Sequence, residues 1–303
     1  MMEIIEDVYI VKPHNPIEPG CCVYMVDTKS EDGLVLIDVG LYIEPIKVIE
    51  KEGFDLKNIK HCLITHGHID HFGACHELEK YNPDIKFYAH EQDADKIENK
   101  IPNQSLNQFF ANYEYEPIKL ARKVKDDNET IKIGKFEFTC IHIPGHTPGS
   151  VAYFLETGNK KLLFAGDLPG IAININDGNL DDYLKSMQKL IAVDIDILCE
   201  GHEDLIKPAE KVNKFIKGYM KINENLNHLV LENPYDIKVL LDLTLLTYEL
   251  EFFETALDFC KYLLELDPNN STGNQLLNKI KEHNPPQIEF IKRLIKENFN
   301  KGK

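Results

Sequence analysis

The sequence predicts a layered α/β domain followed by an all-helical module. Up to about residue 208, short β-rich runs alternate with stretches of helical periodicity, and glycine and proline separate them. From residue 209 onward the strand patterns vanish, and apolar residues fall three and four positions apart. The length of 303 residues also favours two modules, because single cores stop growing near about 250–300 residues. We therefore expect domains at 1–208 and 209–303.

The first domain should contain short strands separated by helices, as in layered folds of mixed class. The expected strands are Leu34–Val39, His61–Thr65, Ile85–Ala89, Ile131–His142, Val151–Leu155, Lys161–Ala165 and Ile195–Cys199. The expected helices are Glu44–Glu52, Ala74–Lys80 and Leu180–Ile191. Between residues 93 and 128 the chain is polar but carries Phe109, Phe110, Tyr113 and Tyr115. These rings either cover the core beneath a long loop or form a lid over a site.

The second domain reads as helices joined by turns. Asn233-Pro234 and residues 267–270 are typical of turns, and Pro285-Pro286 should open a last helix that ends near Phe299. The stretch Leu240–Pro268 resembles one tetratricopeptide hairpin. Such hairpins need neighbours to bury their apolar faces. We expect this module to support a homo-oligomer, to bind a protein partner, or to close the site of the first domain.

Charge and composition exclude several classes of function. The chain has 34 basic and 50 acidic residues, a formal charge of −16, which repels nucleic acid and anionic membrane surfaces. There is no apolar run of about 18 residues, and Met1–Asp7 carries three acids and no basic residue, so neither a membrane span nor a secretory signal is expected. The seven cysteines lack a regular spacing, which favours reduced thiols. A cytoplasmic protein acting on a small molecule is expected.

A dense group of metal-ligand residues follows the expected strand His61–Thr65. The run Thr65-His66-Gly67-His68-Ile69-Asp70-His71 holds three histidines and an aspartate within six residues. Imidazole nitrogens and carboxylate oxygens are the ligands of zinc and comparable divalent ions, and a rigid strand fixes their position. We expect Gly67 to let the chain turn so that these side chains converge. The run therefore predicts a metal site.

Three further motifs place one ligand-type residue beside a glycine, just after an apolar strand. They are Pro144-Gly145-His146, Gly166-Asp167 and Gly201-His202. Together with Asp38 in Ile37-Asp38-Val39-Gly40, the motifs resemble the metallo-β-lactamase superfamily in order and spacing across residues 1–208. The resemblance implies a four-layer αββα sandwich with the site along one edge of the sheets, followed here by the all-α module.

The resemblance also implies a role for each motif residue. His66, His68 and His146 would hold one metal ion, Asp70, His71 and His202 a second, and Asp167 would bridge them. Asp38 would hold the metal loop. Two divalent ions, zinc in the first place and iron or manganese otherwise, would lower the pKa of a shared water toward ~7. The resulting hydroxide, held with the help of Asp70 and Asp167, would cleave a thioester, an ester or lactone, or a phosphodiester.

Departures from the family pattern narrow the class. Asp167 stands where β-lactamases of this superfamily lack a bridging aspartate, so the resemblance favours the glyoxalase II, lactonase and phosphodiesterase branch. Only 34 residues separate Asp167 from His202, which leaves no room for the domain that RNA-cleaving members insert there. Glyoxalase II also has a C-terminal helical domain. However, residues 168–174 contain no basic residue to hold glutathione carboxylates, so the leaving group stays open.

Two other functions remain open. Persulfide dioxygenases of the same superfamily bind one iron through residues that match His66, His146 and Asp167. Alternatively, the helical module makes the chain a scaffold for a partner helix. The remaining histidines near the motifs and the strand cysteines are expected to be structural. These are His61, His76, His90 and His142, and Cys62, Cys140 and Cys199, together with the adjacent pair Cys21-Cys22.

Overall fold

The computed structural model describes residues 1–13, 20–99, 115–168, 170–172, 177–203 and 205–299. It divides into two compact units. The first comprises Met1–Gly170 with Asp181–Asn213, and the second comprises Ile171–Leu180 with Lys214–Lys303. Of the aromatic residues in question between 93 and 128, Phe109, Phe110 and Tyr113 lie outside the described residues. Tyr115 is buried, and its ring packs edge-on against Phe72.

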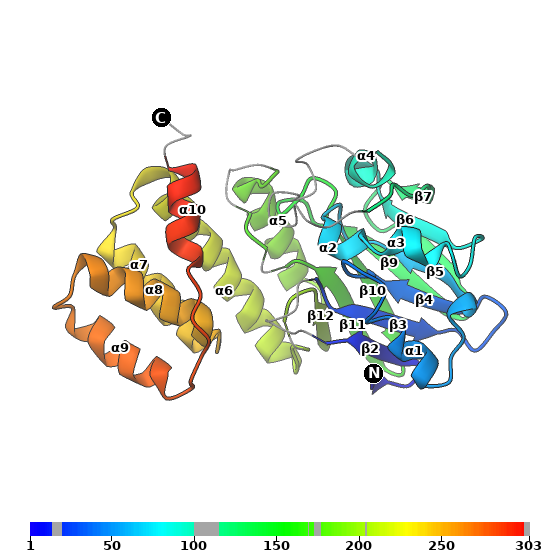
Figure 1. Cartoon of the computed structure of the whole chain (residues 1–303), viewed down its shortest axis with the longest axis horizontal. Coiled ribbons are helices and arrows are strands. Elements are labelled where there is room, and N and C mark those ends of the chain that lie inside the picture. The colour runs from blue at the N-terminus through cyan, green and yellow to red at the C-terminus, as the bar shows by residue number, and fades with distance from the viewer. Residues whose placement is uncertain (14–19, 100–114, 169, 173–176, 204, 300–303) are drawn as a thin grey trace. The chain divides into compact units, whose positions relative to one another are not determined.

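The first sheet runs in the order β1-β2-β3-β4-β5-β6-β7 (Figure 1). Its strands are β1 (Met2–Ile5), β2 (Val8–Lys12), β3 (Val23–Asp27), β4 (Leu34–Ile37), β5 (Ile59–Leu63), β6 (Lys86–His90) and β7 (Leu120–Val124). Strands β1 to β4 pair antiparallel, and β4 to β7 pair parallel. The parallel strands need crossover connections, which here carry the short helices α1 (Val48–Lys51), α2 (Ile69–Phe72) and α3 (Cys75–Leu78).

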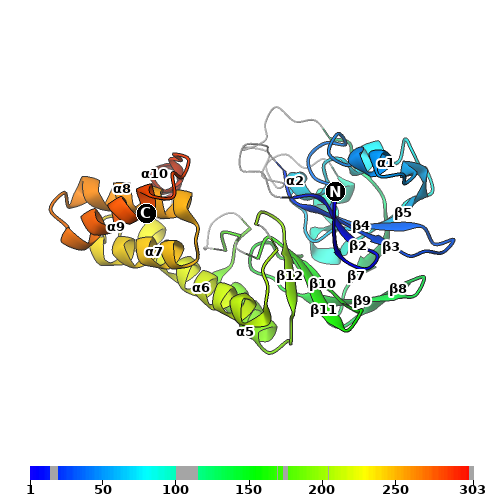
Figure 2. The ribbon, with the colours of Figure 1, turned by 90° about the horizontal axis from the view of Figure 1, so that it is seen from below.

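The second sheet runs in the order β12-β11-β10-β9-β8. Its strands are β8 (Thr130–Ile133), β9 (Phe136–His142), β10 (Val151–Thr157), β11 (Lys160–Gly166) and β12 (Ile197–Glu200). The run expected as one strand, Ile131–His142, is a hairpin that turns at Gly134, whose φ is +56°. Strands β11 and β12 are parallel, and α5 (Leu180–Ile191) connects them and lies beside β12 (Figures 1 and 2).

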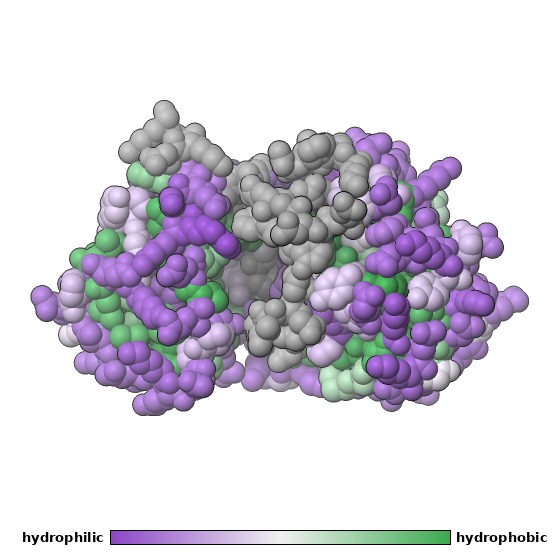
Figure 3. Space-filling model, viewed as in Figure 1, coloured by the Kyte–Doolittle hydropathy of each residue, from purple (hydrophilic) through white to green (hydrophobic). Residues whose placement is uncertain are grey.

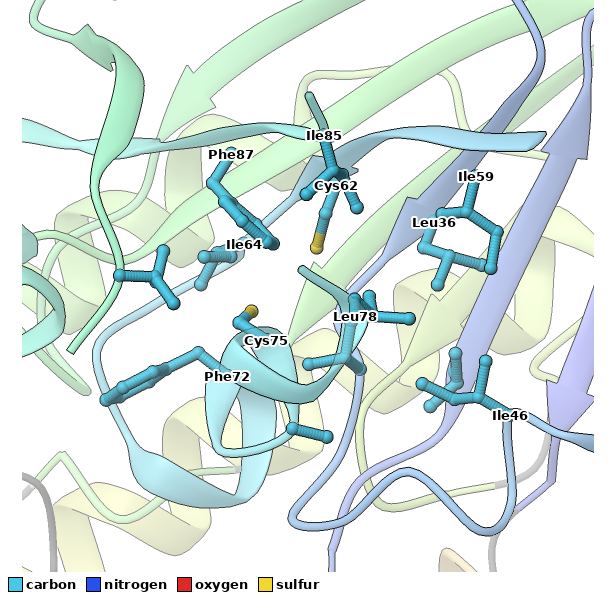
Figure 4. Close-up of a cluster of buried hydrophobic side chains, with 14 of the residues drawn as sticks. Leu36, Ile46, Ile59, Cys62, Ile64, Phe72, Cys75, Leu78, Ile85 and Phe87 are labelled. Atoms are coloured by element: carbon cyan, nitrogen blue, oxygen red, sulfur yellow. The ribbon is translucent and has the colours of Figure 1, made fainter. Parts of the chain in front are cut away.

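Side chains alternate between the two faces of the first sheet, which explains the layers. On β4, Leu34 and Leu36 belong to the core under the helices, whereas Val35 and Ile37 belong to the core between the sheets. Figure 4 shows the first of these cores, in which Phe72 of α2 and Cys75 and Leu78 of α3 face the sheet. Figure 2 shows α1 and α2 on one side of the first sheet and the second sheet on the other. The predicted αββα sandwich is therefore confirmed.

The second unit is helical, as predicted. Its elements are the end of α6 (Ala209–Asn227), the π-helical turn η3 (His228–Glu232), α7 (Ile237–Glu249), α8 (Phe253–Leu266), α9 (Ser271–Lys281) and α10 (Phe290–Asn298). Asp236 and Asn270 cap α7 and α9 through backbone N–H groups of the first turn. The last helix begins at Phe290 rather than at Pro285, and the carboxylate of Asp258 in α8 accepts a hydrogen bond from Ile291 N in its first turn.

Where Figure 3 colours the surface by hydropathy, hydrophilic residues are the more frequent, as expected for a chain with so many charged residues. Among the described residues, the large hydrophobic side chains that are exposed are Met2, Tyr235 and Leu266. No helix in the described ranges is long and apolar enough to cross a membrane.

Candidate metal centre

The first ligand loop connects β5 to α2 and buries its polar side chains. His66, His68, Asp70 and His71 are all at most 5% exposed. The chain bends at His66 and Gly67, as expected, without a positive φ at Gly67. A Cβ at this position would lie only 3.0 Å from Cδ of Lys96. The bare backbone of Gly67 therefore packs closely against Asp93 and Lys96.

One cluster of donors contains three histidines. Nδ1 of His68 lies 3.0 Å from Nε2 of His66 and 2.9 Å from Nε2 of His146. Oδ2 of Asp167 completes the group, 3.4 Å from His146 Nε2 and 4.0 Å from His66 Nε2. Burial, and then the neighbouring His146, lower the pKa of His68 to about 3, and burial holds the pKa of His66 well below its usual value. Both imidazoles are therefore neutral, which is the form that binds metal.

A second cluster lies on the other side of Asp167. Nε2 of His202 is 3.3 Å from Nε2 of His71 and 3.3 Å from Oδ2 of Asp70. Oδ1 of Asp167 is 2.8 Å from His71 Nε2 and 3.2 Å from His202 Nε2. Burial alone would raise the pKa of Asp167, but the two imidazoles outweigh it and hold that pKa well below its usual value. The carboxylate is therefore ionised.

Exposure distinguishes the two sides of this arrangement. The side chain of His71 is fully buried, whereas that of His202 is 33% exposed and those of His146 and Asp167 are 11% and 12% exposed. A ligand can therefore approach from the side of His202, His146 and Asp167. All seven residues expected as metal ligands lie in the two clusters, with Asp167 between them.

Asp38 makes the contacts that the resemblance implies. It follows β4 in a left-handed conformation, with φ at +54°. Its Oδ1 accepts a hydrogen bond from Thr65 N, and its Oδ2 accepts from Thr65 Oγ1, both at 2.8 Å. Oδ2 also lies 2.8 Å from Nδ1 of His71. With Nδ1 directed at this carboxylate, Nε2 is the ring nitrogen that faces the cluster and could bind an ion.

Cys21 lies beside one of the expected metal ligands, His71. Its thiol, Asp38 and His71 form a third group of ligand-type atoms within 4.8 Å of one another. Burial raises the pKa of Cys21, so the thiol stays protonated. Nδ1 of His71 already contacts Asp38. We therefore interpret Cys21 and Asp38 as residues that support the imidazole of His71, and not as ligands of a separate ion.

Two buried acids were not predicted from the sequence. Glu200 accepts hydrogen bonds from Leu168 N at 3.1 Å and from His202 N at 2.5 Å. Burial, together with Asp167, raises its pKa to about 8. Asp93 contacts both loops of the histidine-rich cluster. An acid directly before Gly201-His202 was a usable signal for Glu200, whereas Asp93 lies in a polar segment that resembles a surface helix.

The other histidines make contacts outside the two clusters. His142 stacks on His90 with ring centroids 3.9 Å apart and an interplanar angle of 9°. Nδ1 of His61 lies 2.9 Å from the hydroxyl of Tyr88, and Nδ1 of His76 lies 2.9 Å from the carbonyl of Gly73. These contacts are typical of histidines that stabilise local structure.

The fold and the site together define a class of protein: an αββα sandwich whose histidines and aspartates gather on loops after β5, β9, β11 and β12. Comparison with known proteins gives the family. The Metallo-beta-lactamase superfamily model matches residues 18–202. The chain therefore belongs to the metallo-beta-lactamase superfamily.

Individual relatives agree with this membership. The hydroxyacylglutathione hydrolase GloC of Haemophilus influenzae is 30% identical over 215 residues, which cover 68% of this chain and 96% of that protein. The probable metallo-hydrolase YqgX of Bacillus subtilis is 30% identical over 168 residues, 52% of this chain and 75% of that protein. The structure of BJP-1, a subclass B3 metallo-beta-lactamase of Bradyrhizobium japonicum, matches with a TM-score of 0.56 at 26% identity, covering 66% of this chain and 76% of that one. The predicted class, a metal-binding hydrolase, is confirmed at this level.

Proposed function

We propose that this chain is a dinuclear metal-dependent hydrolase of a small thioester, ester, lactone or phosphodiester. One observation carries the proposal: the two oxygens of Asp167 face different donor clusters, Oδ2 toward His146 and Oδ1 toward His71 and His202. A carboxylate between two sets of nitrogen donors is an arrangement that suits a pair of divalent ions.

The donor set fits metal ions. Among the described residues, Oδ1 of Asp70 is buried without a hydrogen-bond partner, and so is Oδ1 of Asp167, although ring nitrogens lie close to it. Buried carboxylate oxygens of this kind need a cation. We assign one ion to His66, His68 and His146, a second to Asp70, His71 and His202, and Asp167 to both. Imidazole and carboxylate ligands suit zinc first, and iron or manganese as well.

The residues of the chain prepare this site for hydrolysis. When bound, the ions would supply Lewis acidity and would lower the pKa of a bound water toward ~7. Burial keeps His66 and His68 neutral, because it lowers the pKa of both side chains, so they add no positive charge. Asp70 and Asp167 remove two of the four positive charges of two divalent ions. The remaining charge would favour the oxyanion that develops when an acyl or phosphoryl group is attacked.

The substrate is best sought among thioesters first. GloC is named as a hydroxyacylglutathione hydrolase, and it is matched over nearly its whole length. The test is a panel containing a hydroxyacyl-glutathione thioester, a lactone, a phosphodiester and a β-lactam, measured before and after chelation. We expect turnover of at least one substrate that chelation abolishes and zinc restores.

Two outcomes would contradict the proposal. One iron per chain with oxygen-dependent turnover would indicate a dioxygenase that uses His66, His146 and Asp167. A chain that binds no metal at saturating zinc would favour a binding role for the helical unit instead.

A further inference from the structure

Asp93 lies between the two loops that carry the histidine-rich cluster. It ends the 3-10 helix η2 (Glu91–Asp93), directly after β6, and its side chain is fully buried. Oδ2 accepts hydrogen bonds from Gly67 N at 2.8 Å and from Thr147 Oγ1 at 2.6 Å. Oδ1 accepts from Gly149 N at 3.2 Å and from Lys96 Nζ at 3.1 Å.

Two of these donors directly adjoin the histidines of this cluster in the sequence. Gly67 separates His66 from His68, and Thr147 directly follows His146. One carboxylate therefore connects a loop after β5 with a loop after β9, which belong to different sheets. Any increase in the separation of the two loops would stretch at least one of its hydrogen bonds.

Close packing reinforces these hydrogen bonds. A Cβ at Gly149 would lie 2.6 Å from Cγ of Asp93, and a Cβ at Gly67 would lie 3.1 Å from Cβ of Asp93. Both loops therefore approach Asp93 by their bare backbone. In an interior packed at this density, the loops cannot move closer to one another without displacing Asp93.

Lys96 balances the charge of the buried carboxylate. It lies on the next turn, in α4 (Ala94–Glu98), and is only 6% exposed. A buried aspartate without such a partner would lose its proton only with difficulty. Burial raises the pKa of Asp93, but Lys96 and the hydrogen bonds outweigh that effect and lower it below its usual value. Asp93 is therefore a charged acceptor, which holds its donors more firmly than a neutral one.

We propose that Asp93 is a positioning residue that sets the geometry of the first metal site, formed by His66, His68 and His146. The inference rests on the proposed metal centre. Asp93 itself does not reach the site. It fixes the separation of the two loops, so the three imidazole nitrogens stay within bonding distance of one ion.

The test compares Asp93→Asn with the unchanged protein by zinc titration against a competing chelator. The amide keeps the shape of the side chain but offers one acceptor oxygen where the carboxylate offers two. We expect the affinity of the first site to fall 10- to 100-fold, with little change at the second. The visible spectrum of the cobalt(II)-loaded protein should change as well, because the ligand geometry of one ion changes.

Two controls separate positioning from general stability. Asp258→Asn replaces a buried carboxylate in the helical unit, where it accepts a hydrogen bond from Ile291 N at 2.7 Å. This variant should lower the melting temperature and leave zinc affinity unchanged. Thr147→Val removes the hydroxyl that donates to Asp93 and should lower the zinc affinity of the first site. Thr147→Ser keeps that hydroxyl and should keep the affinity of the unchanged protein. The threonine pair decides the question if Asp93→Asn does not fold.

The outcomes are distinguishable. If the unchanged protein binds no zinc, the proposed metal centre itself is wrong. If it binds two ions and Asp93→Asn, or Thr147→Val, binds both with unchanged affinity and an unchanged cobalt spectrum, then the metal centre stands and the role of Asp93 is refuted.

Discussion

Replacing Asp38 by asparagine should weaken the second metal site without disturbing the backbone. Asparagine, like the native aspartate, adopts the left-handed φ of +54° at this position more readily than other residues with a side chain. The carboxylate accepts from Thr65 N, from Thr65 Oγ1 and from His71 Nδ1, each at 2.8 Å. In Asp38→Asn only one oxygen remains, so an NH₂ group takes the place of Oδ2.

This NH₂ group reverses the proton position on His71. Because two donors cannot face each other, Nδ1 of His71 must accept, and its proton moves to Nε2. Nε2 then no longer offers a lone pair to an ion. Losing the hydrogen bond that orients a metal-binding histidine typically lowers metal affinity 10- to 100-fold, which is about 1.4–2.8 kcal/mol. The same change in the serine protease triad, where the tautomer is also wrong, lowers kcat by about 10⁴, which shows how large the effect of a wrong tautomer can be.

The assay is a zinc titration with parallel measurement of hydrolysis and melting temperature. Asp27→Asn serves as the matched control, since Asp27 is a buried carboxylate on the neighbouring strand β3 that binds Lys29 and not the ligand loops. We expect Asp38→Asn to bind one ion normally and the other weakly, and Asp27→Asn to bind both. Unchanged affinity for two ions in Asp38→Asn would refute the argument from the tautomer.

Two further predictions concern catalysis and pH. Asp167→Asn should lower turnover by at least about 10²-fold, in line with the loss of a preorganised charged group, while the chain stays folded; near-native turnover with both metals bound would show that Asp167 does not bridge. His142→Ala, which removes a stacked ring outside the clusters, should retain metal and activity. Burial lowers the pKa of His61 from 6.5 to about 4. Between these two pH values the unfolded chain therefore binds more protons than the folded chain does. The free energy of unfolding should fall as the pH drops through this window, by up to about 3 kcal/mol. In metal-free protein, His61→Gln should flatten this dependence in denaturant titrations, and an identical pH profile would contradict the assignment.

The metal ligands were predictable because each lies in the chain directly after an apolar strand. Strands of one sheet bring such positions to a common edge, and the two sheets pack face to face, so His71 after β5 of the first sheet meets His202 after β12 of the second. Asp38 was predictable for the same reason. Asp93 was not, because it lies in a polar run with Glu91 and Asp95 that has the pattern of a solvated surface. Its burial depends on contacts with Gly67 and Gly149 that local periodicity does not reveal.

The missed elements have a similar explanation. Strand β3 is buried on both faces, so it lacks the alternation that marks a half-buried strand, and the edge strand β1 is too short to show one. Helices α1 and α3 are a single turn each, shorter than the runs expected from apolar spacing. Packing against the sheet stabilises these two helices, and the intrinsic helix propensity of their residues contributes little.

The most direct test of the central claim is the metal content of the chain, purified without added salts and analysed by elemental mass spectrometry alongside hydrolysis of the substrate panel. The account predicts two divalent ions per chain, loss of hydrolysis when both are removed, and recovery when zinc is returned. One iron per chain, with turnover that consumes oxygen and continues when no second ion is present, would contradict it.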